Sequence, residues 1–147
     1  MHFILVMEDD PVARRLLESV LSAAGYEVEA PHSYMEALGI IGSKTTDVLL
    51  LDVSAPEHYG ASFVRLARRM GWKGQAVLLS TRADWQTLCG EIQAAFGLGK
   101  PFDIDDLIGR ITALLPPRTP TGRKQRAARP TSADRLRRRR RGSPARA

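Results

Sequence analysis

Short, wholly apolar segments that alternate with helical patterns constrain the fold of this chain more than any other feature. Continuous apolar runs at 3–7, 48–51 and 76–79 are typical of strands buried on both faces of a parallel sheet. A shorter strand is predicted at 26–30, and a weaker one at 96–99, where two glycines lower the strand propensity. Five strands that alternate with helices predict an α/β fold with a parallel sheet covered on both sides.

Capping residues and apolar residues at helical spacing mark five helices between and after these strands. Asp10 followed by proline opens the first helix, and Gly25 closes it. Ser33 and Glu36 form a capping box at the start of the second helix, which runs to about residue 41. The remaining helices are predicted at 61–70, from Asp84 to about residue 95, and from Asp103 to residue 115.

The charge distribution divides the chain after residue 115. Residues 1–115 have a net charge of −5 and residues 116–147 one of +11, which together give the +6 of the whole chain. The second segment is rich in proline and arginine, including the arginine run 137–141, and its only large apolar side chain is Leu136. Such a segment buries too little surface to offset the entropy of ordering it. We therefore expect a domain at 1–115 followed by a disordered basic tail at 116–147.

Several classes of protein are disfavoured by the composition. No apolar run approaches the roughly 20 residues that a membrane span needs, and the first residues do not resemble a secretion signal. Cys89 is the single cysteine, which excludes an internal disulfide and a metal site with several cysteines. We expect a cytoplasmic protein without membrane insertion.

Polar side chains follow four of the five predicted strands. Glu8 and Asp9 follow the first strand, Asp52 the third, Ser80 the fourth and Lys100 the fifth. Ligands of open parallel sheets bind outside the carboxyl ends of the strands. We therefore expect these side chains to share one crevice.

The chemistry of this set favours phosphoryl transfer. Crowded carboxylates repel one another, and a divalent cation removes that cost. Oxygen ligands favour Mg²⁺, which keeps several waters and accepts a phosphate oxygen, while a lysine and a hydroxyl can bind the remaining phosphoryl oxygens. Asp52 is the best phosphoryl acceptor because it stands alone at the end of the central strand, and Glu8 and Asp9 would hold the metal.

Four segments together resemble the receiver domain of bacterial two-component response regulators: 3–11, 52–60, 79–81 and 100–102. Each segment alone is a weak signal, since acidic residues after a strand often only cap a helix, but the combination is specific. The resemblance covers residues 1–115. It implies a flavodoxin-like, doubly wound sheet of five strands in the order 2-1-3-4-5, flanked by five helices. It also implies a phosphoprotein that receives its phosphoryl group on an aspartate, with Mg²⁺, from a histidine kinase or a phosphotransfer protein.

The resemblance assigns the acidic residues by position. Asp52 becomes the phosphoacceptor, which would carry an aspartyl phosphate. Glu8, Asp9 and Asp52 become the metal ligands, and Ser54 would add its backbone carbonyl to the metal.

The same resemblance assigns the residues around the phosphoryl group. Ser80 would be the switching hydroxyl and Lys100 would contact the phosphoryl oxygens, with a cis peptide bond expected before Pro101. Ser54 and Arg82 would flank the path of the hydrolytic water and tune the lifetime of the phosphorylated state.

One position departs from the family pattern. The aromatic switch residue of the family would lie three residues before Lys100, where this chain has Gly97, and the nearest aromatic is Phe96. A shift of one residue along a strand turns a side chain to the other face of the sheet. Either Phe96 serves through a local bulge, or the aromatic part of the switch is absent, which we favour.

The function expected from the sequence is that of a stand-alone receiver, a non-enzymatic protein that switches its binding to a downstream partner. A first alternative is a receiver-like scaffold that binds its partner constitutively, as the altered position 97 suggests. A second is a regulator that contacts nucleic acid non-specifically, or an acidic partner, through residues 118–147. The tail favours polyanions through counterion release, but no motif for reading bases accompanies it.

Overall fold

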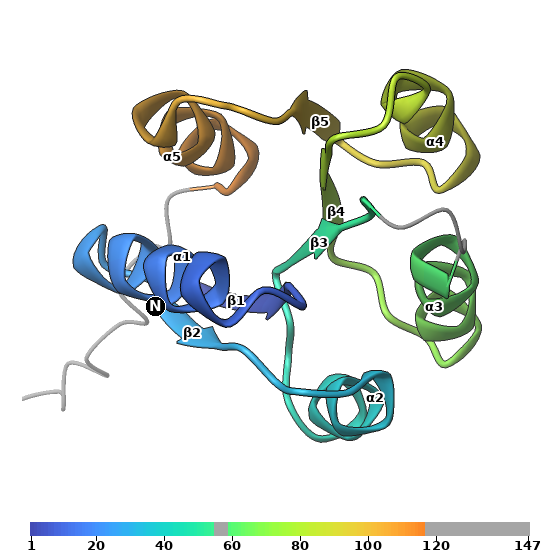
Figure 1. The fold of residues 1–147 in the computed structure, drawn as a ribbon. Coiled ribbons are helices and arrows are strands. Elements are labelled where there is room, and N and C mark those ends of the chain that lie inside the picture. The colour runs from blue at the N-terminus through green and yellow to red at the C-terminus, as the bar shows by residue number, and fades with distance from the viewer. Residues whose placement is uncertain (55–58, 117–147) are drawn as a thin grey trace, which may run out of the picture. The chain divides into compact units, whose positions relative to one another are not determined.

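The computed structural model describes residues 1–54 and 59–116, and it confirms the predicted α/β fold. Five parallel strands form one sheet in the order β2-β1-β3-β4-β5, and five helices flank it (Figure 1). The elements are β1 (Phe3–Met7), α1 (Pro11–Ala23), β2 (Glu27–Glu29), α2 (Tyr34–Ser43), β3 (Val48–Asp52), α3 (Tyr59–Arg69), β4 (Gln75–Ser80), α4 (Trp85–Glu91), β5 (Phe96–Gly99) and α5 (Ile104–Leu114). The predicted basic tail at 116–147 lies outside the described residues except for Pro116.

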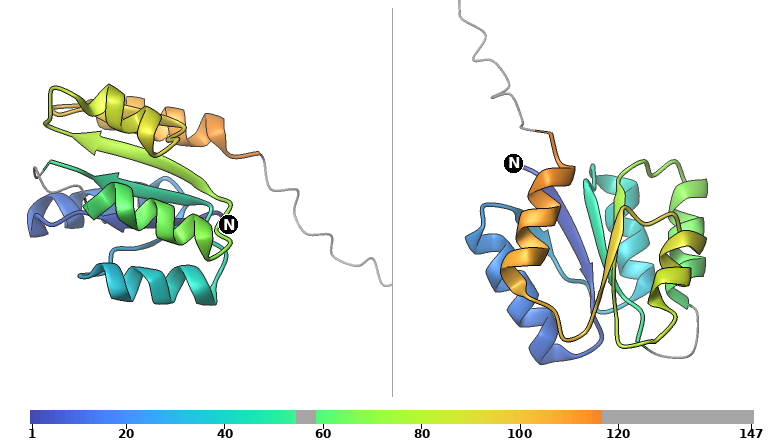
Figure 2. Two further views of the ribbon diagram at one scale, coloured as in Figure 1. Left: turned by 90° about the vertical axis from the view of Figure 1, so that its right-hand side faces the viewer. Right: turned by 90° about the horizontal axis from the view of Figure 1, so that it is seen from above.

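The helices divide between the two faces of the sheet. Helices α1 and α5 cover one face, and α2, α3 and α4 cover the other, as both views of Figure 2 show. Successive strand residues alternate between two cores: Val6 and Leu50 pack toward α1 and α5, whereas Leu5 and Leu51 pack toward α2, α3 and α4. Because both faces are covered, the central strands have no polar face, which explains their continuous apolar runs.

Side-chain caps fix where several helices begin. The carboxylate of Asp10 accepts a hydrogen bond from the Val12 amide, and the hydroxyl of Ser33 accepts one from the Glu36 amide at 3.1 Å. Asp103 caps α5 in the same way. These bonds satisfy amides that have no partner within the helix, so the predicted helix starts are confirmed.

The prediction for α4 was wrong in its length and its cap. This helix ends at Glu91 instead of near residue 95, because the backbone enters the left-handed region at Gln93, with φ of 51°. Asp84 precedes the helix but its carboxylate does not cap it; it pairs instead with the guanidinium of Arg82, at 2.8 and 2.9 Å. The chain then returns directly into β5.

The two ends of the sheet differ in character. At the amino ends of the strands, the buried indole nitrogen of Trp72 donates to the Thr46 carbonyl at 2.9 Å. At the carboxyl ends, β1, β3, β4 and β5 each lead into a polar loop. Within the described residues, no helix is both long and apolar enough to cross a membrane.

Candidate functional site

A cavity of about 530 Å³ lies at the carboxyl edge of the sheet. Its lining includes five of the residues selected from the sequence, namely Glu8, Asp9, Asp52, Ser54 and Lys100. They come from three separate places in the chain, at the carboxyl ends of β1, β3 and β5, and the parallel strand order brings them together. The expected crevice is therefore present, with Asp52 as the last residue of the central strand β3.

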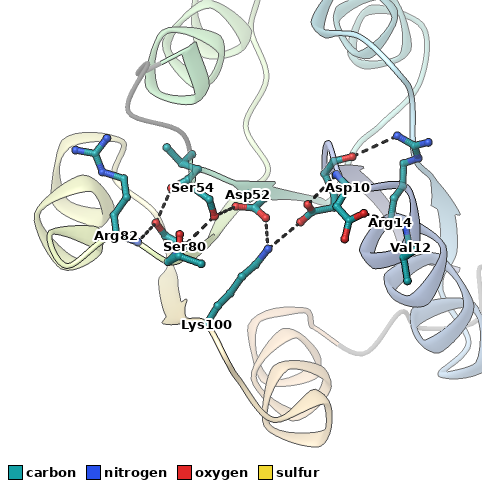
Figure 3. A network of polar contacts seen from close by, with 11 residues as sticks. Asp10, Val12, Arg14, Asp52, Ser54, Ser80, Arg82 and Lys100 are labelled. Carbon is teal, nitrogen blue, oxygen red and sulfur yellow. Dashed lines mark hydrogen bonds and ion pairs between the residues drawn. The ribbon is translucent and has the colours of Figure 1, made fainter.

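Lys100 is the centre of the polar network in this cavity (Figure 3). Its ammonium group donates to the carboxylate of Glu8 at 3.2 Å and also to that of Asp52. The side chains of Glu8 and Asp52 are only 5% and 8% exposed, and that of Lys100 is 23% exposed. The lysine thus supplies positive charge to two buried carboxylates. The peptide bond between Lys100 and Pro101 is cis, as the resemblance implies.

The two buried carboxyl groups have opposite pKa shifts. Burial raises the pKa of Glu8 to about 7, and its hydrogen bond to Asp52 and the negative charge of Asp52 act in the same direction. Burial also acts to raise the pKa of Asp52, but hydrogen bonds with Glu8, Lys100 and Ser54 outweigh it, so the pKa of Asp52 is lowered. A proton shared by the pair therefore resides on Glu8, and Asp52 remains an ionised carboxylate.

Ser80 is fully buried beside the cavity and does not line it. Its hydroxyl donates to the carbonyl of Val53 and accepts a hydrogen bond from the Arg82 amide at 3.0 Å. A hydroxyl has one proton to donate, so Ser80 can serve one acceptor at a time. In this structure that acceptor is the backbone of the loop after β3.

Ser54 and Arg82 occupy different surroundings on the two sides of the crevice. The hydroxyl of Ser54 donates to Asp52, and it lies 3.4 Å from the amide of Thr81, which also lines the cavity. The guanidinium of Arg82 pairs with Asp84. It points away from Asp52 (Figure 3). Ser54 therefore contacts the acceptor carboxylate directly, and Arg82 contacts the site through its backbone amide.

The register of β5 decides between the two alternatives for the aromatic position. Val77 pairs with Phe96 and Leu78 with Gly97, and the pairing continues without a bulge. Phe96 lies on the α5 face of the sheet, where the guanidinium of Arg110 lies 5.6 Å from its ring centre. Gly97 lies on the opposite face, toward α4. The bulge that would have allowed Phe96 to replace the missing aromatic is not present.

The carboxylates of Glu8, Asp9 and Asp52 are the candidate ligands of a magnesium ion. In residues 1–54 and 59–116, no three side chains of His, Cys, Asp or Glu converge closely enough to hold a metal by themselves. Mg²⁺ in phosphoryl-transfer sites, however, is held by one or two carboxylates together with waters and phosphate oxygens. Glu8 and Asp52 are adjacent, the exposed Asp9 lines the same cavity, and burial together with the neighbouring Asp52 raises the pKa of Glu8, as expected where two carboxylates crowd together. These residues fit the ion.

Sequence reasoning did not select two tyrosines that line the cavity. Tyr34 begins α2 and stacks at 5.0 Å on the ring of Phe63, whereas Tyr59 begins α3 and is largely exposed. Burial raises the pKa of the Tyr34 phenol, as do the charges of Asp9 and Asp52. Each tyrosine is the first residue of a helix that follows a strand. This position in the sequence could have indicated that both lie near the carboxyl edge of the sheet.

Comparison with known proteins identifies the family. The model of the response regulator receiver domain matches residues 4–112. The chain belongs to this family. Its receiver domain is 36% identical over 114 residues to the response regulator MprA of Mycobacterium tuberculosis (strain H37Rv), an alignment that covers 76% of this chain and 50% of MprA. The chain thus spans about half the length of the curated relatives it matches.

Solved receiver structures share the same architecture. The response regulator TrrA of Thermotoga maritima, crystallised in complex with Mg²⁺ and BeF, is 28% identical, with a TM-score of 0.68 over 78% of this chain and 100% of TrrA. The chemotaxis protein CheY4 of Vibrio cholerae is 27% identical, with a TM-score of 0.70 over 78% of this chain and 99% of CheY4. Response regulators act in two-component signalling with histidine kinases or phosphotransfer proteins, and the receiver family binds Mg²⁺ at its phosphorylation site.

Proposed function

We propose that this chain accepts a phosphoryl group on Asp52 from a histidine kinase or a phosphotransfer protein, and thereby changes its binding to a downstream protein. The observation that carries this proposal is the state of Asp52. Its carboxylate is buried at the end of the central strand, has a lowered pKa, and lies in the cavity within hydrogen-bond reach of Lys100. The chain would act as a phosphoacceptor and not as an enzyme on other substrates.

Phosphoryl transfer to Asp52 needs a nucleophilic carboxylate and positive charge close to the phosphoryl oxygens. An oxygen of Asp52 attacks the phosphorus of the donor, a new bond forms between that oxygen and phosphorus, and the bond from phosphorus to the leaving group breaks. The leaving group takes the electron pair of that bond. Lys100 already bonds the acceptor carboxylate, so its ammonium can pair with the incoming phosphoryl oxygens.

Glu8, Asp9 and Asp52 would hold a magnesium ion, together with the backbone carbonyl of Ser54. When bound, the ion neutralises negative charge on the phosphoryl oxygens. Glu8 must lose its proton to become a ligand, because a protonated carboxyl is a poor donor to a hard cation. Lys100 must also release Glu8 to some extent, since both positive charges would approach the same oxygens.

Ser80 would change its hydrogen-bond acceptor when Asp52 is phosphorylated. An aspartyl phosphate adds charge and strong acceptor oxygens beside Ser80, which compete with the Val53 carbonyl for its single hydroxyl proton. Ser54 bonds Asp52, and Arg82 lies on the loop that bonds Ser80, so both would tune how long the phosphoryl group persists.

The direct test is phosphorylation of the full chain by acetyl phosphate with Mg²⁺, followed by intact-mass measurement. The wild type should gain one phosphoryl group, and Asp52→Asn should gain none. Asp105→Asn is the matched control, because Asp105 is an exposed residue of the first turn of α5, and this variant should react like the wild type. A wild type that gains no phosphoryl group, or an Asp52→Asn variant that gains one, would reject the proposal.

A constitutive scaffold makes a different prediction for the same variants. In that case Asp52→Asn binds the downstream partner as tightly as the wild type does, with or without a phosphodonor. Binding that changes only in the phosphorylated wild type supports the switch and rejects the scaffold.

The charge of residues 118–147 favours a second candidate function in addition to the first. These residues lie outside the described part of the structure, and they contain 12 arginines and lysines against the single acid Asp134. Contacts of such a segment with nucleic acid or an acidic partner weaken steeply with salt. Deleting 118–147 should abolish retention on DNA or RNA at low salt, and replacing the five arginines at 137–141 by glutamine should weaken it. Unchanged retention of the deleted chain would reject this candidate.

A further inference from the structure

The indole of Trp85, the first residue of α4, lies directly over the backbone of β5. A Cβ atom placed on Gly97 would lie 3.1 and 3.2 Å from two carbons of the Trp85 ring, and one placed on Gly99 would lie 3.0 Å from its indole nitrogen. Both sets of distances are shorter than ordinary van der Waals contact, so a side chain at either position would require the Trp85 ring to shift. The two glycines of β5 therefore allow the close approach of this tryptophan.

Trp85 occupies the place that a side chain at position 97 would take. Gly97 is buried and pairs with Leu78, so a side chain there would point toward α4. A Cβ atom at this position would also overlap the sulfur of Cys89, one helical turn after Trp85. The aromatic group next to β5 on this face is thus supplied by the helix and not by the strand.

Two hydrogen-bonded contacts lead from Ser80 to Asp84, and the backbone joins Asp84 to Trp85. The hydroxyl of Ser80 accepts the Arg82 amide at 3.0 Å, and the guanidinium of Arg82 holds the carboxylate of Asp84, the residue that precedes Trp85. A Ser80 hydroxyl that turns toward a phosphoryl group changes the geometry of the first of these contacts. The displacement then reaches the beginning of α4 within five residues of Ser80.

The other end of α4 is fixed to the body of the domain. The guanidinium of Arg68, on α3, donates to the carbonyl of Ile92 and to that of Gln93 at 3.1 Å. Ile92 and Leu88 are buried in the core beneath the helix. Because these contacts hold the C-terminal end of α4, a displacement of the loop at 81–84 would move mainly its N-terminal end, where Trp85 lies.

We propose that Trp85, instead of an aromatic side chain on β5, transmits the phosphorylation state of Asp52 to the α4 surface through Ser80, Arg82 and Asp84. This inference rests on the proposed function, since it requires a phosphoryl group on Asp52. It gives the receiver a working aromatic group despite the glycine at position 97.

The chain contains two tryptophans, and they provide a signal and an internal reference. Trp85 lies beside the site, whereas Trp72 is 8% exposed at the opposite edge of the sheet and bonded to Thr46. The full chain, labelled with ¹⁵N, gives one indole cross-peak for each tryptophan, and Trp72→Phe and Trp85→Phe assign them. After beryllium fluoride and Mg²⁺ are added, the Trp85 cross-peak should move and the Trp72 cross-peak should not. Neither should move in Asp52→Asn.

A second variant tests the route through Ser80. Ser80→Ala removes the hydroxyl, so its Trp85 cross-peak should move less than in the wild type when the site is occupied. Ser43→Ala, at the end of α2, is the matched control and should respond fully. A full response in Ser80→Ala would overturn the proposed route.

The possible failures are distinguishable by measuring phosphorylation on the same samples. If intact mass shows that acetyl phosphate modifies the chain but the Trp85 cross-peak does not move, the inference is overturned and the proposed function stands. If the chain is not modified at all, the proposed function fails and the inference fails with it.

Discussion

Replacing Glu8 by glutamine is expected to flatten the pH dependence of the free energy of unfolding between about pH 4.5 and 7. In the folded, metal-free protein the pKa of Glu8 is about 7, against an ordinary value of 4.5. The folded state therefore holds a proton that the unfolded state has released, and this contribution to stability is lost as the pH rises through that interval. At about 1.4 kcal/mol per pKa unit, the loss amounts to at most about 3.5 kcal/mol.

The pH dependence that Asp52 contributes to the free energy of unfolding lies at lower pH and does not mask that of Glu8. The pKa of Asp52 is lowered from 3.8, so its contribution is present above that value and is lost only at lower pH. Urea unfolding in the presence of a chelator, followed by circular dichroism from pH 5 to 8, measures the difference between wild type and Glu8→Gln. Glu18→Gln, an exposed position on α1, is the matched control and should keep the wild-type slope. Parallel curves for wild type and Glu8→Gln would refute the reasoning.

Four further outcomes follow from the packing and charges. Magnesium should stabilise the wild type more at pH 8 than at pH 6, measured by thermal unfolding, because it competes with the proton on Glu8. Lys100→Met should cost about 1–3 kcal/mol in the metal-free protein, and Mg²⁺ should restore much of it, since two buried carboxylates lose their shared donor. Gly97→Ala should cost about 1–3 kcal/mol by overpacking, whereas Gly39→Ala, a helical position with open space around it, should gain about 0.5–1 kcal/mol. Leu50→Ala, at a position 1% exposed, should cost about 2–5 kcal/mol in urea unfolding.

The fold could be predicted because burial on both faces leaves a clear mark on the sequence. Strands such as β3 are apolar at every position up to Asp52, and the first polar residue after the runs of β1, β3, β4 and β5 marks the carboxyl edge. The same pattern predicts one crevice for Glu8, Asp52 and Lys100, and all three line one cavity in the structure. These predictions depend on local pattern and on strand order, both of which the chain specifies strongly.

The features of α4 and β5 that the sequence did not predict depend on tertiary contacts. The early end of α4 follows from the backbone at Gln93, and nothing in the neighbouring side chains signals it. The cap expected of Asp84 is lost to Arg82, two residues before it. The two glycines of β5 predict a weak strand from the sequence, whereas in the structure they allow the close approach of Trp85. A pair of glycines spaced two apart in a strand is a useful signal that a large ring from another element lies above it.

The contacts of Lys100 with Glu8 and Asp52 affect the stability of the domain when no divalent ion is bound. A site that must admit a divalent ion needs an excess of negative charge, and such an excess weakens a folded domain when the ion is absent. Here the ammonium group of Lys100 supplies a monovalent counterion, which would move away from Glu8 if the proposed magnesium ion bound. The receiver can therefore remain folded in a metal-poor solution and still be ready to bind.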